Sequence, residues 1–262
     1  MSDVFVIDVG HTRLKRGRFT QRDGEWICLD FQAELLHESV TSRSFLPQIP
    51  ITDQVILCGS MLTEMEKLAE RIRQERRCRV DLIAAYRQIP LVLDVDFPER
   101  VGPDRLLNGL FASRAKRPES AAIVVASGTA LVVDLIAPDG RFLGGTISPG
   151  LMMGARALAH FTERLPELTI EELPLQPAFP GRHTHQAIAA GLVHSHRGAV
   201  QALVTQCQQA LPPETPVDVF LTGGGAPWLQ NLGIPTQLCP EMTLRGALLA
   251  WETQTAHEKP TG

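Results

Sequence analysis

Two short glycine turns decide the fold of this chain: VIDVGHTR at residues 6–13 and VVASGTA at residues 124–130. Each turn lies between two apolar segments, which predicts hairpin strands at residues 5–7, 14–19, 123–125 and 131–135. A glycine lets the backbone reverse tightly and brings its N–H groups close to an anion. Two such hairpins far apart in the chain indicate a duplicated fold that binds one polyphosphate between its halves. The turns therefore predict an enzyme that handles phosphate groups.

Composition narrows the class further. With 262 residues, 44% of them hydrophobic and 21% charged, the chain can bury a large core as one or two domains. Its net charge of -4 at pH 7 provides no general attraction to nucleic acid. No apolar run is long enough to span a bilayer, and a strand begins almost at once, so we expect neither a membrane segment nor a secretory signal. The cysteines are odd in number and lack CxxC spacing, which favours a reduced cytoplasmic chain without disulfides; they are Cys28, Cys58, Cys78, Cys207 and Cys239.

Strand and helix patterns alternate through the first half. Residues 54–58 predict a short buried strand, and Ser60 is a suitable N-cap for the helix after it. The apolar residues of that helix recur at helical spacing, at Leu62, Met65, Leu68, Ala69 and Ile72. A second helix is expected from Pro103, with an apolar side formed by Leu106, Leu107, Leu110 and Phe111. Residues 115–119 are interpreted as the crossing between the halves.

The second half continues the alternation. Four prolines between residues 165 and 181 predict an irregular loop. A long helix is expected next, with one face formed by Ala187, Ile188, Gly191, Leu192, Val200, Leu203 and Cys207. A strand at residues 217–221 then enters the glycine cluster TGGGA at residues 222–226, and a last helix is expected near residues 244–251.

The common phosphate-binding motifs are absent. The chain contains no Gly-Lys pair, which excludes a P-loop, and no GxGxxG, which excludes a dinucleotide fingerprint. What remains is a strand–turn–strand hairpin used twice, followed by the glycine cluster. Taken singly, each piece is typical of a plain hairpin. Their order resembles the actin-like ATPase and sugar kinase superfamily, whose two ribonuclease H-like halves close over a nucleotide.

Five ordered blocks make the resemblance narrower. They are DVGHTRLK at residues 8–15, GPDR at 102–105 with Asn108, SGTA at 127–130 with Asp134, Gly140 and GGTISPGL at 144–151, GRHT at 181–184, and TGGGA at 222–226. These blocks resemble those of type III pantothenate kinase, a family also known as Bvg accessory factor, over residues 4 to about 249. The resemblance implies transfer of the ATP γ-phosphoryl group to the 4′-hydroxyl of pantothenate, which opens coenzyme A synthesis. It also implies a homodimer.

The same resemblance implies an α/β protein with two ribonuclease H-like halves, at residues 1–114 and 115–262, and with ATP and Mg2+ in the cleft. The first half would carry the first phosphate hairpin and the catalytic aspartate, and the second half the other hairpin and the adenosine motif. Asp8 would coordinate Mg2+ directly or through water. The implied ATP-binding residues are Asp8, Val9, Gly10, His11, Thr12, Arg13, Leu14, Lys15, Gly128, Thr129, Gly223 and Gly224.

Asp104 is the candidate base for the proton of the substrate hydroxyl. Read alone, an Asp one residue after a helix-starting proline complements the helix dipole, but the other blocks favour the catalytic role. Arg105 suits the pantothenate carboxylate because a guanidinium can donate two hydrogen bonds to it; a surface arginine is the alternative. Thr184 could reach the site of a neighbouring subunit or cap the helix after it, and both roles can hold. The implied substrate-binding residues are Val95, Gly102, Pro103, Asp104, Arg105 and Thr184.

Three positions depart from the family pattern. His11 stands where the first hairpin usually has Asn, and its bulkier, titratable ring changes the donor offered to phosphate. Ala126 replaces an Asp of the family's monovalent-cation site, so we expect that site to be absent or weak. Val95 stands where many members have a substrate-facing Tyr. None of these three departures alters Asp8, Asp104, Arg105 or Thr129. We therefore expect an active enzyme that uses these four residues.

Three other functions compete with this one. A catalytically weak regulatory relative is disfavoured by the retained Asp8 and Asp104. A kinase for another small alcohol stays open because fold does not determine substrate. A zinc site would use His183, His185, His194 and His196. Residues i and i+2 of a helix point in different directions, and no Cys or carboxylate completes the set, so we interpret these as surface or loop histidines.

Overall fold

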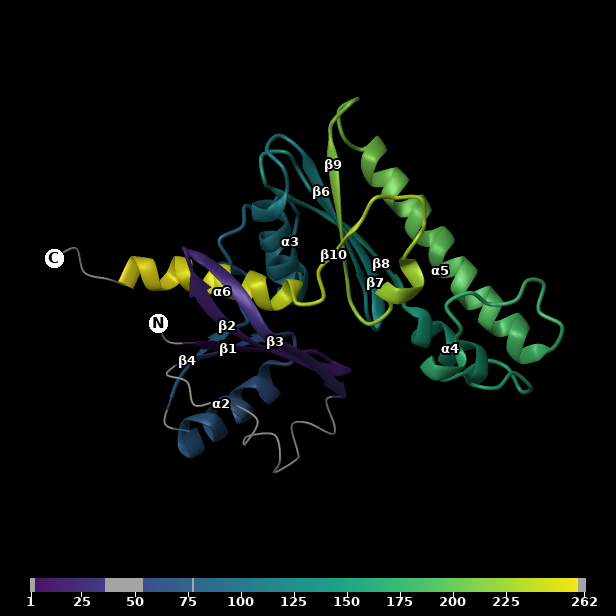
Figure 1. Ribbon diagram of the computed structural model, residues 1–262, viewed down its shortest axis with the longest axis horizontal. Helices are drawn as coiled ribbons and strands as arrows, with labels where there is room; N and C mark the ends of the chain where they lie inside the picture. The colour runs from purple at the N-terminus through teal and green to yellow at the C-terminus, as the bar shows by residue number, and fades with distance from the viewer. Residues whose placement is uncertain (1–2, 36–53, 77, 259–262) are drawn as a thin grey trace. The chain divides into compact units, whose positions relative to one another are not determined.

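The computed structural model describes residues 3–35, 54–76 and 78–258 (Figure 1). Its internal contacts divide the chain into two compact units: unit 1 is Met1–Arg114 with Glu241–Gly262, and unit 2 is Ala115–Pro240. Among the described helices, none combines the length and apolarity needed to cross a membrane. Each unit contains its own sheet and its own core.

Unit 1 is built on a five-stranded sheet with the order β3-β2-β1-β4-β5. Its strands are β1 (Val4–Val9), β2 (Arg13–Arg22), β3 (Glu25–Leu35), β4 (Gln54–Gly59) and β5 (Arg79–Ile83). The first three strands form an antiparallel meander, and β4 and β5 run parallel to β1. The helices are α2 (Leu62–Arg76), α3 (Pro103–Ala115) and α6 (Met242–Glu258), with the short 3-10 helices η2 (Tyr86–Gln88) and η3 (Pro98–Arg100).

The core of unit 1 lies between α2 and one face of this sheet. It contains Phe5, Ile7 and Val9 of β1 together with Met65, Leu68, Ala69 and Ile72 of α2. The predicted apolar face of the helix is confirmed at those four positions. Leu62, expected on the same face, is the first residue of α2 and is exposed. Successive side chains of a strand point to opposite faces, so Asp8 of β1 lies on the face away from α2.

The last helix, α6, belongs to unit 1 and packs against β1 and β4. A Cβ atom at Gly246 of α6 would overlap the carbonyl oxygen of Leu107 in α3, so the two helices meet backbone to backbone. Across the same contact, Thr243 Oγ1 donates to Asn108 Oδ1 at 2.9 Å. The range 115–262 expected for the second half therefore differs from this division at its C-terminal end.

Unit 2 is built on a second five-stranded sheet, with the order β10-β9-β6-β7-β8. Its strands are β6 (Ala121–Ser127), β7 (Ala130–Ile136), β8 (Phe142–Pro149), β9 (Val217–Thr222) and β10 (Gln237–Leu238). Its helices are α4 (Leu151–His160) and α5 (Thr184–Gln209), with the 3-10 helices η4 (Ile170–Glu172) and η5 (Ala226–Leu229). The proline-rich segment at residues 165–181 is irregular apart from η4, as expected.

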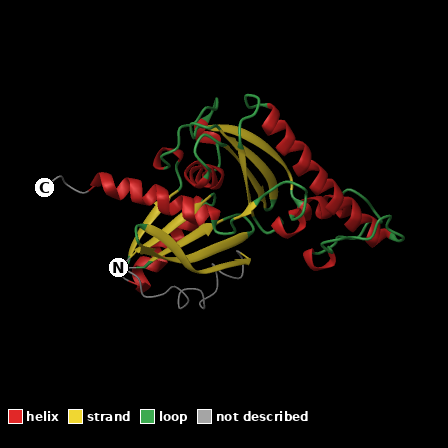
Figure 2. Ribbon diagram, turned by 45° about the horizontal axis from the view of Figure 1, so that its top comes forward, coloured by secondary structure: helices red, strands yellow, loops and turns green. Residues whose placement is uncertain are grey.

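The two sheets, yellow in Figure 2, share one topology. In unit 2, β6, β7 and β8 form the antiparallel meander, and β9 and β10 run parallel to β6. β6 and β9 therefore correspond to β1 and β4 of unit 1. Both predicted hairpins are present, as β1–β2 and β6–β7. The duplicated α/β fold predicted from the two glycine turns is confirmed.

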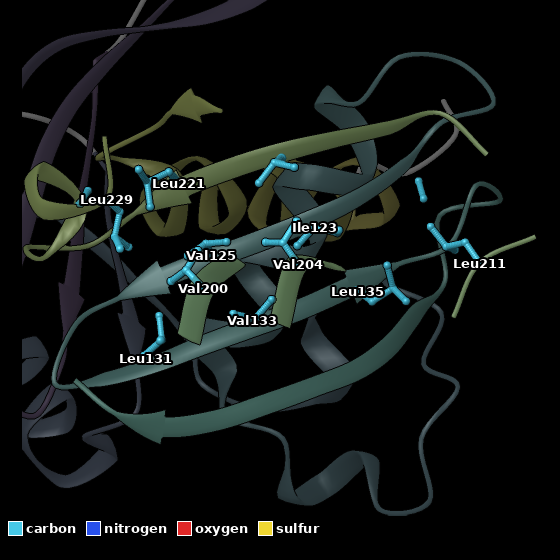
Figure 3. Packing of buried hydrophobic residues seen from close by; sticks show 13 residues of the cluster. Ile123, Val125, Leu131, Val133, Leu135, Val200, Val204, Leu211, Leu221 and Leu229 are labelled. Carbon is cyan, nitrogen blue, oxygen red and sulfur yellow. The ribbon is translucent and has the colours of Figure 1, made fainter. Parts of the chain in front are cut away.

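The core of unit 2 lies between α5 and the sheet. Val200 and Val204 of α5 point toward the strands β6 and β7 (Figure 3). The strand residues around them include Ile123, Val125, Leu131, Val133, Leu135 and Leu221. A second cluster joins α4 to the N-terminal half of α5 through Leu151, Ile188 and Val193.

The buried side of α5 differs from the predicted one. It consists of Ile188, Ala189, Ala190, Val193, His196, Val200 and Val204. Ala187 and Gly191, expected on the apolar face, are exposed. The difference arises because α5 packs against both α4 and the sheet. The side of α5 that carries Val193 and His196 is therefore the buried one. The apolar side of α5 thus serves the interior of unit 2 and does not by itself indicate a subunit contact.

Candidate active site

Asp8 is the central polar residue of unit 1. It lies near the end of β1, is only 4% exposed, and faces Lys15 in the register between β1 and β2. The Lys15 Nζ atom lies 3.3 Å from Asp8 Oδ2. The other carboxylate oxygen, Oδ1, is buried and has no hydrogen-bond partner among the described residues. A buried carboxylate oxygen without a donor suits a hard divalent cation.

A second carboxylate, that of Asp104, affects the pKa of Asp8. Burial raises the pKa of Asp8, the ammonium group of Lys15 opposes the shift, and the negative charge of Asp104 adds to it. Cys58 lies beside Asp8 in the parallel register between β1 and β4. Burial first, and then the Asp8 charge, raise the pKa of the Cys58 thiol well above its ordinary value. The thiol therefore stays protonated, and Asp8 and Asp104 share one electrostatic environment.

Asp104 is the second residue of α3, in its first turn, and its side chain is exposed. The carbonyl oxygen of Gly102 accepts hydrogen bonds from the N–H groups of Arg105 and Leu106, at 3.1 and 3.2 Å, which starts the helix. A Cβ atom on Gly102 would lie 2.6 Å from Asp104 Oδ1. Gly102 is thus the residue that leaves room for the Asp104 carboxylate in this position.

The first glycine turn is closed by its own backbone. The N–H of Gly10 donates to the carbonyl oxygen of Arg13 at 3.1 Å, so this amide is not a donor for phosphate. Val9 and Leu14 are fully buried in the core beneath α2. Of the ATP-binding residues expected here, the exposed ones are His11 and Thr12 at the tip of the turn and Arg13, the first residue of β2.

Sequence reasoning missed the support of His11. Its Nδ1 atom lies 3.1 Å from Ser60 Oγ, which follows β4. Gly59, the last residue of β4, has a φ of +128°, and a Cβ atom there would lie 2.5 Å from the carbonyl oxygen of Val9. The predicted N-cap role of Ser60 is wrong, because α2 starts at Leu62 and the Met65 N–H donates to the carbonyl of Met61. The signal in the sequence was a glycine at the end of a buried strand, followed directly by a serine.

The second glycine turn is held by the start of α4. The N–H of Gly128 donates to the carbonyl oxygen of Ala130 at 2.9 Å, and the N–H of Gly150 donates to that of Thr129 at 3.2 Å. A Cβ atom on Gly150 would lie 2.5 Å from the carbonyl oxygens of both Gly128 and Thr129. Gly150 is the N-cap of α4, so only a glycine allows this helix to begin against the turn. Gly128 and Thr129 remain exposed.

The glycine cluster after β9 lies directly against the second turn. Gly223 has a φ of +94°, and a Cβ atom there would overlap the carbonyl group of Ser127. The N–H of Gly225 donates to the Ser127 carbonyl oxygen at 2.8 Å, while Gly224 between them is exposed. Gly223 corresponds to Gly59 of unit 1. Gly59 is the last residue of β4, Gly223 directly follows β9, and each has a positive φ. Both units use the same close approach to support their turn.

One of the four histidines considered for zinc has a different role. His196 is buried, and its Nε2 atom lies 2.9 Å from Ser127 Oγ, so its interpretation as a surface or loop residue is wrong. His183, His185 and His194 are exposed. Among the described residues, no group of three or more His, Cys, Asp or Glu side chains could hold a metal ion. The signal for His196 was its helical spacing with Val193 and Val200.

Four further candidates lie in varied surroundings. Thr184 is exposed as the first residue of α5, and the N-cap is His183 rather than Thr184. Arg105 and Val95 are half-buried, Val95 in the irregular segment before η3. Ala126 is half-buried on β6, in register with Val132 and Thr222, and its methyl group supplies no oxygen for a cation.

The duplicated meander-and-parallel sheets, each with a glycine turn at its central hairpin, have the fold of the actin-like ATPase and sugar kinase superfamily. Over 96% of this chain and 99% of the other, the fold is similar to a Baf family protein from Campylobacter jejuni, with a TM-score of 0.56 at 16% identity. A Listeria monocytogenes protein described as an N-acetylmannosamine kinase is similar over 97% of this chain and 99% of its own, with a TM-score of 0.52 at 13% identity.

The sequence comparisons identify the family. The chain belongs to the type III pantothenate kinase family, whose sequence model matches residues 4–206. It is 41% identical to the type III pantothenate kinase of Rhodopirellula baltica, over 70% of this chain and 68% of that protein. It is 34% identical to that of Kosmotoga olearia, over 68% of this chain and 66% of that protein, which is slightly under two thirds. The match to the Desulfatibacillum aliphaticivorans protein is longer, at 28% identity over 87% and 90%.

Proposed function

We propose that this protein transfers the γ-phosphoryl group of ATP to the 4′-hydroxyl of pantothenate, forming 4′-phosphopantothenate in the first step of coenzyme A synthesis. The observation that carries the proposal is the carboxylate pair of unit 1, found in a chain of this family. Asp104 is exposed at the first turn of a helix, and its charge acts on the buried Asp8. One carboxylate accessible to a substrate and one buried with an unpartnered oxygen suit the base and the metal ligand that phosphoryl transfer uses.

Asp104 acts as the base in this mechanism. The 4′-hydroxyl oxygen of pantothenate attacks the γ-phosphorus, and the hydroxyl proton moves to the Asp104 carboxylate. The bond from the γ-phosphorus to the β,γ-bridging oxygen breaks, and ADP leaves with that electron pair. Arg105 holds the pantothenate carboxylate through paired hydrogen bonds, and Val95, Gly102 and Pro103 line the substrate.

Asp8 is the residue that would hold Mg2+, through the oxygen that has no hydrogen-bond donor among the described residues. When bound, the ion neutralises the phosphate charge that develops during transfer. Lys15 adds positive charge beside the same carboxylate. His11, Thr12 and Thr129 donate to the phosphates, since the amides of Gly10 and Gly128 are used within their turns. Gly223 and Gly224 allow the ribose and adenine to approach the backbone closely.

We expect turnover to depend little on monovalent cations. Ala126 supplies no oxygen, and without a carboxylate the lost hydration of K+ is poorly offset. Replacing K+ by Na+ or by a bulky organic cation at fixed ionic strength should change the rate by less than about twofold. A steep loss without K+ would mean that other oxygens form the site. Ala126→Asp should introduce K+ dependence that the matched Ala126→Asn variant lacks, since only the aspartate adds charge.

A homodimer is part of the proposal, with Thr184 reaching the substrate of the neighbouring subunit. Its support is the family resemblance and the exposed apolar side chains of unit 2, Phe161 and Phe179, each 80% exposed. Sedimentation at micromolar concentration should give twice the chain mass of 28.7 kDa. A monomer would remove both the dimer and the shared role of Thr184. A cytoplasmic location is also part of the proposal, and its support is the odd number of cysteines in the sequence and their lack of CxxC spacing.

The decisive experiment measures ADP release by the purified protein in the presence and absence of pantothenate. Pantetheine and simple sugars serve as competing acceptors. Pantothenate-dependent release supports the proposal. Release with another alcohol alone would assign a different kinase activity, and no release with any acceptor would favour the regulatory relative.

A further inference from the structure

His196 is a buried polar side chain in the apolar side of α5, and the mechanism above does not use it. It is 5% exposed and lies on the same side of the helix as Val193 and Val200. Burial lowers the pKa of its imidazole, so the ring is neutral at physiological pH. A neutral ring has one donor and one acceptor nitrogen. A polar group in this position needs a partner, and its partner is Ser127 Oγ at 2.9 Å.

Ser127 is the residue at which the second glycine turn and the glycine cluster of unit 2 meet. It is the last residue of β6, directly before Gly128 and Thr129. Its carbonyl oxygen accepts the N–H of Gly225 at 2.8 Å. A Cβ atom on Gly225 would overlap Ser127 Oγ, and one on Gly223 would overlap the Ser127 carbonyl. The side chain and backbone of Ser127 therefore determine how the hairpin and the glycine cluster lie against each other.

α5 holds the same region at two further points. The Nε of Arg197 donates to the carbonyl oxygen of Trp228 in η5 at 2.7 Å. The Nε2 of Gln201 donates to the carbonyl oxygen of Leu232 at 3.0 Å. The segment that follows the glycine cluster is thus hydrogen-bonded to the helix that carries His196. Among these contacts, the one from His196 reaches the hairpin itself.

We propose that His196 is a positioning residue for nucleotide binding: through Ser127 it sets the distance between the second glycine turn and the glycine cluster. This inference rests on the proposed function, in which Thr129, Gly223 and Gly224 contact ATP. A polar group left without its buried partner is costly, so loss of the imidazole should let the two turns separate or shift. The result is weaker nucleotide binding rather than an altered chemical step.

The test compares His196→Leu with His196→Gln. Leucine fills the buried space of the imidazole but offers no hydrogen-bond partner to Ser127. The amide of glutamine can replace the Nε2 contact. His196→Leu should raise the Kd for ADP with Mg2+ and the KM for ATP about tenfold. The KM for pantothenate should stay within about twofold, because that substrate does not contact these turns. His196→Gln should restore most of the nucleotide affinity.

Two further variants keep the test decisive. Ser127→Ala removes the other end of the same hydrogen bond and should weaken ADP binding similarly, with little added loss in the double variant. His194→Leu makes the same substitution at an exposed position of the same helix and should leave ADP binding unchanged. If His196→Leu lowers the melting temperature but binds ADP as the parent does, the residue only fills the core and the proposal is overturned. Equal weakening by the Leu and Gln variants would overturn it too, because the hydrogen bond would then be irrelevant.

The measurement of ADP binding tests this inference separately from the proposed function. If the parent protein binds ADP with Mg2+ but phosphorylates no pantothenate, the proposed reaction fails, and the His196 variants still decide the positioning role. If the parent binds no ADP, the positioning role falls as well.

Discussion

Replacing Asp104 by asparagine should lower kcat about a hundredfold or more, while the KM for ATP and the melting temperature stay nearly constant. The amide keeps the shape of the side chain but cannot accept the proton of the attacking hydroxyl. The carboxylate is exposed at the second position of α3, so the fold does not depend on its burial. The first-turn helix dipole loses about 0.3–1 kcal/mol of favourable interaction, which is small beside the kinetic effect.

Steady-state kinetics and a thermal melt of the same preparation check this expectation. Asp23→Asn is the matched control, since Asp23 is exposed in the β2–β3 turn with a φ of 50°, a conformation that asparagine tolerates. That variant should keep the parent rate. Parental turnover of Asp104→Asn would return Asp104 to the role of a residue that complements the helix dipole.

Replacing Asp8 by asparagine should raise the Mg2+ concentration needed for half-maximal rate about tenfold or more. An amide oxygen carries no charge and binds a hard divalent cation weakly. The metal-free variant should be at least as stable as the parent at neutral pH. Burial raises the pKa of Asp8, so the folded state disfavours its charged form despite Lys15. An Mg2+ titration that overlays the parent curve would leave Asp8 without a metal role.

The raised pKa of Asp8 also predicts how the stability difference between Asp8→Asn and the parent changes with pH. A raised folded pKa means that the protonated form contributes stability at low pH, and that this contribution disappears as pH rises from the unfolded pKa near 3.8 through the folded pKa. The advantage of Asp8→Asn over the parent should therefore grow across that interval and level off above it. Urea denaturation without metal at several pH values measures the difference.

Asp218 provides a control of opposite sign. Burial would raise the pKa of Asp218, but hydrogen bonds from the Arg117 backbone, the Ser120 hydroxyl and the Arg117 guanidinium lower it. Its ionised form therefore contributes stability above the unfolded pKa, and that contribution is lost as pH falls. Asp218→Asn should destabilise the protein at neutral pH and leave the Mg2+ titration unchanged. If the stability of Asp8→Asn and Asp218→Asn relative to the parent changed with pH in the same direction, the opposite pKa shifts assigned to the two residues would be contradicted.

Local sequence was sufficient for the two hairpins, whereas β3, β5, β8, β10 and α4 were not predicted from it. The turns at Gly10 and Gly128 need glycine chemistry and apolar flanks, all within a few residues, and the strands β1, β2, β6 and β7 formed where those flanks predicted. The order of the phosphate-related blocks likewise pointed to the superfamily and the family that the comparisons identify. The face of α2 followed from spacing alone, apart from its exposed first residue.

The supports of the candidate site depended on tertiary structure. His11 meets Ser60 across 49 positions of the chain, Ser127 meets His196 across 69, and Asn108 meets Thr243 across 135. No periodicity or turn signal extends that far, because such signals arise from neighbours within a helical turn or a strand pair. The register of the sheets and the packing of helices on them determine these distant pairs. The same packing joins α6 to unit 1 through Gly246 and Leu107, and it buries His196 although His194 and Ser195 just before it are exposed.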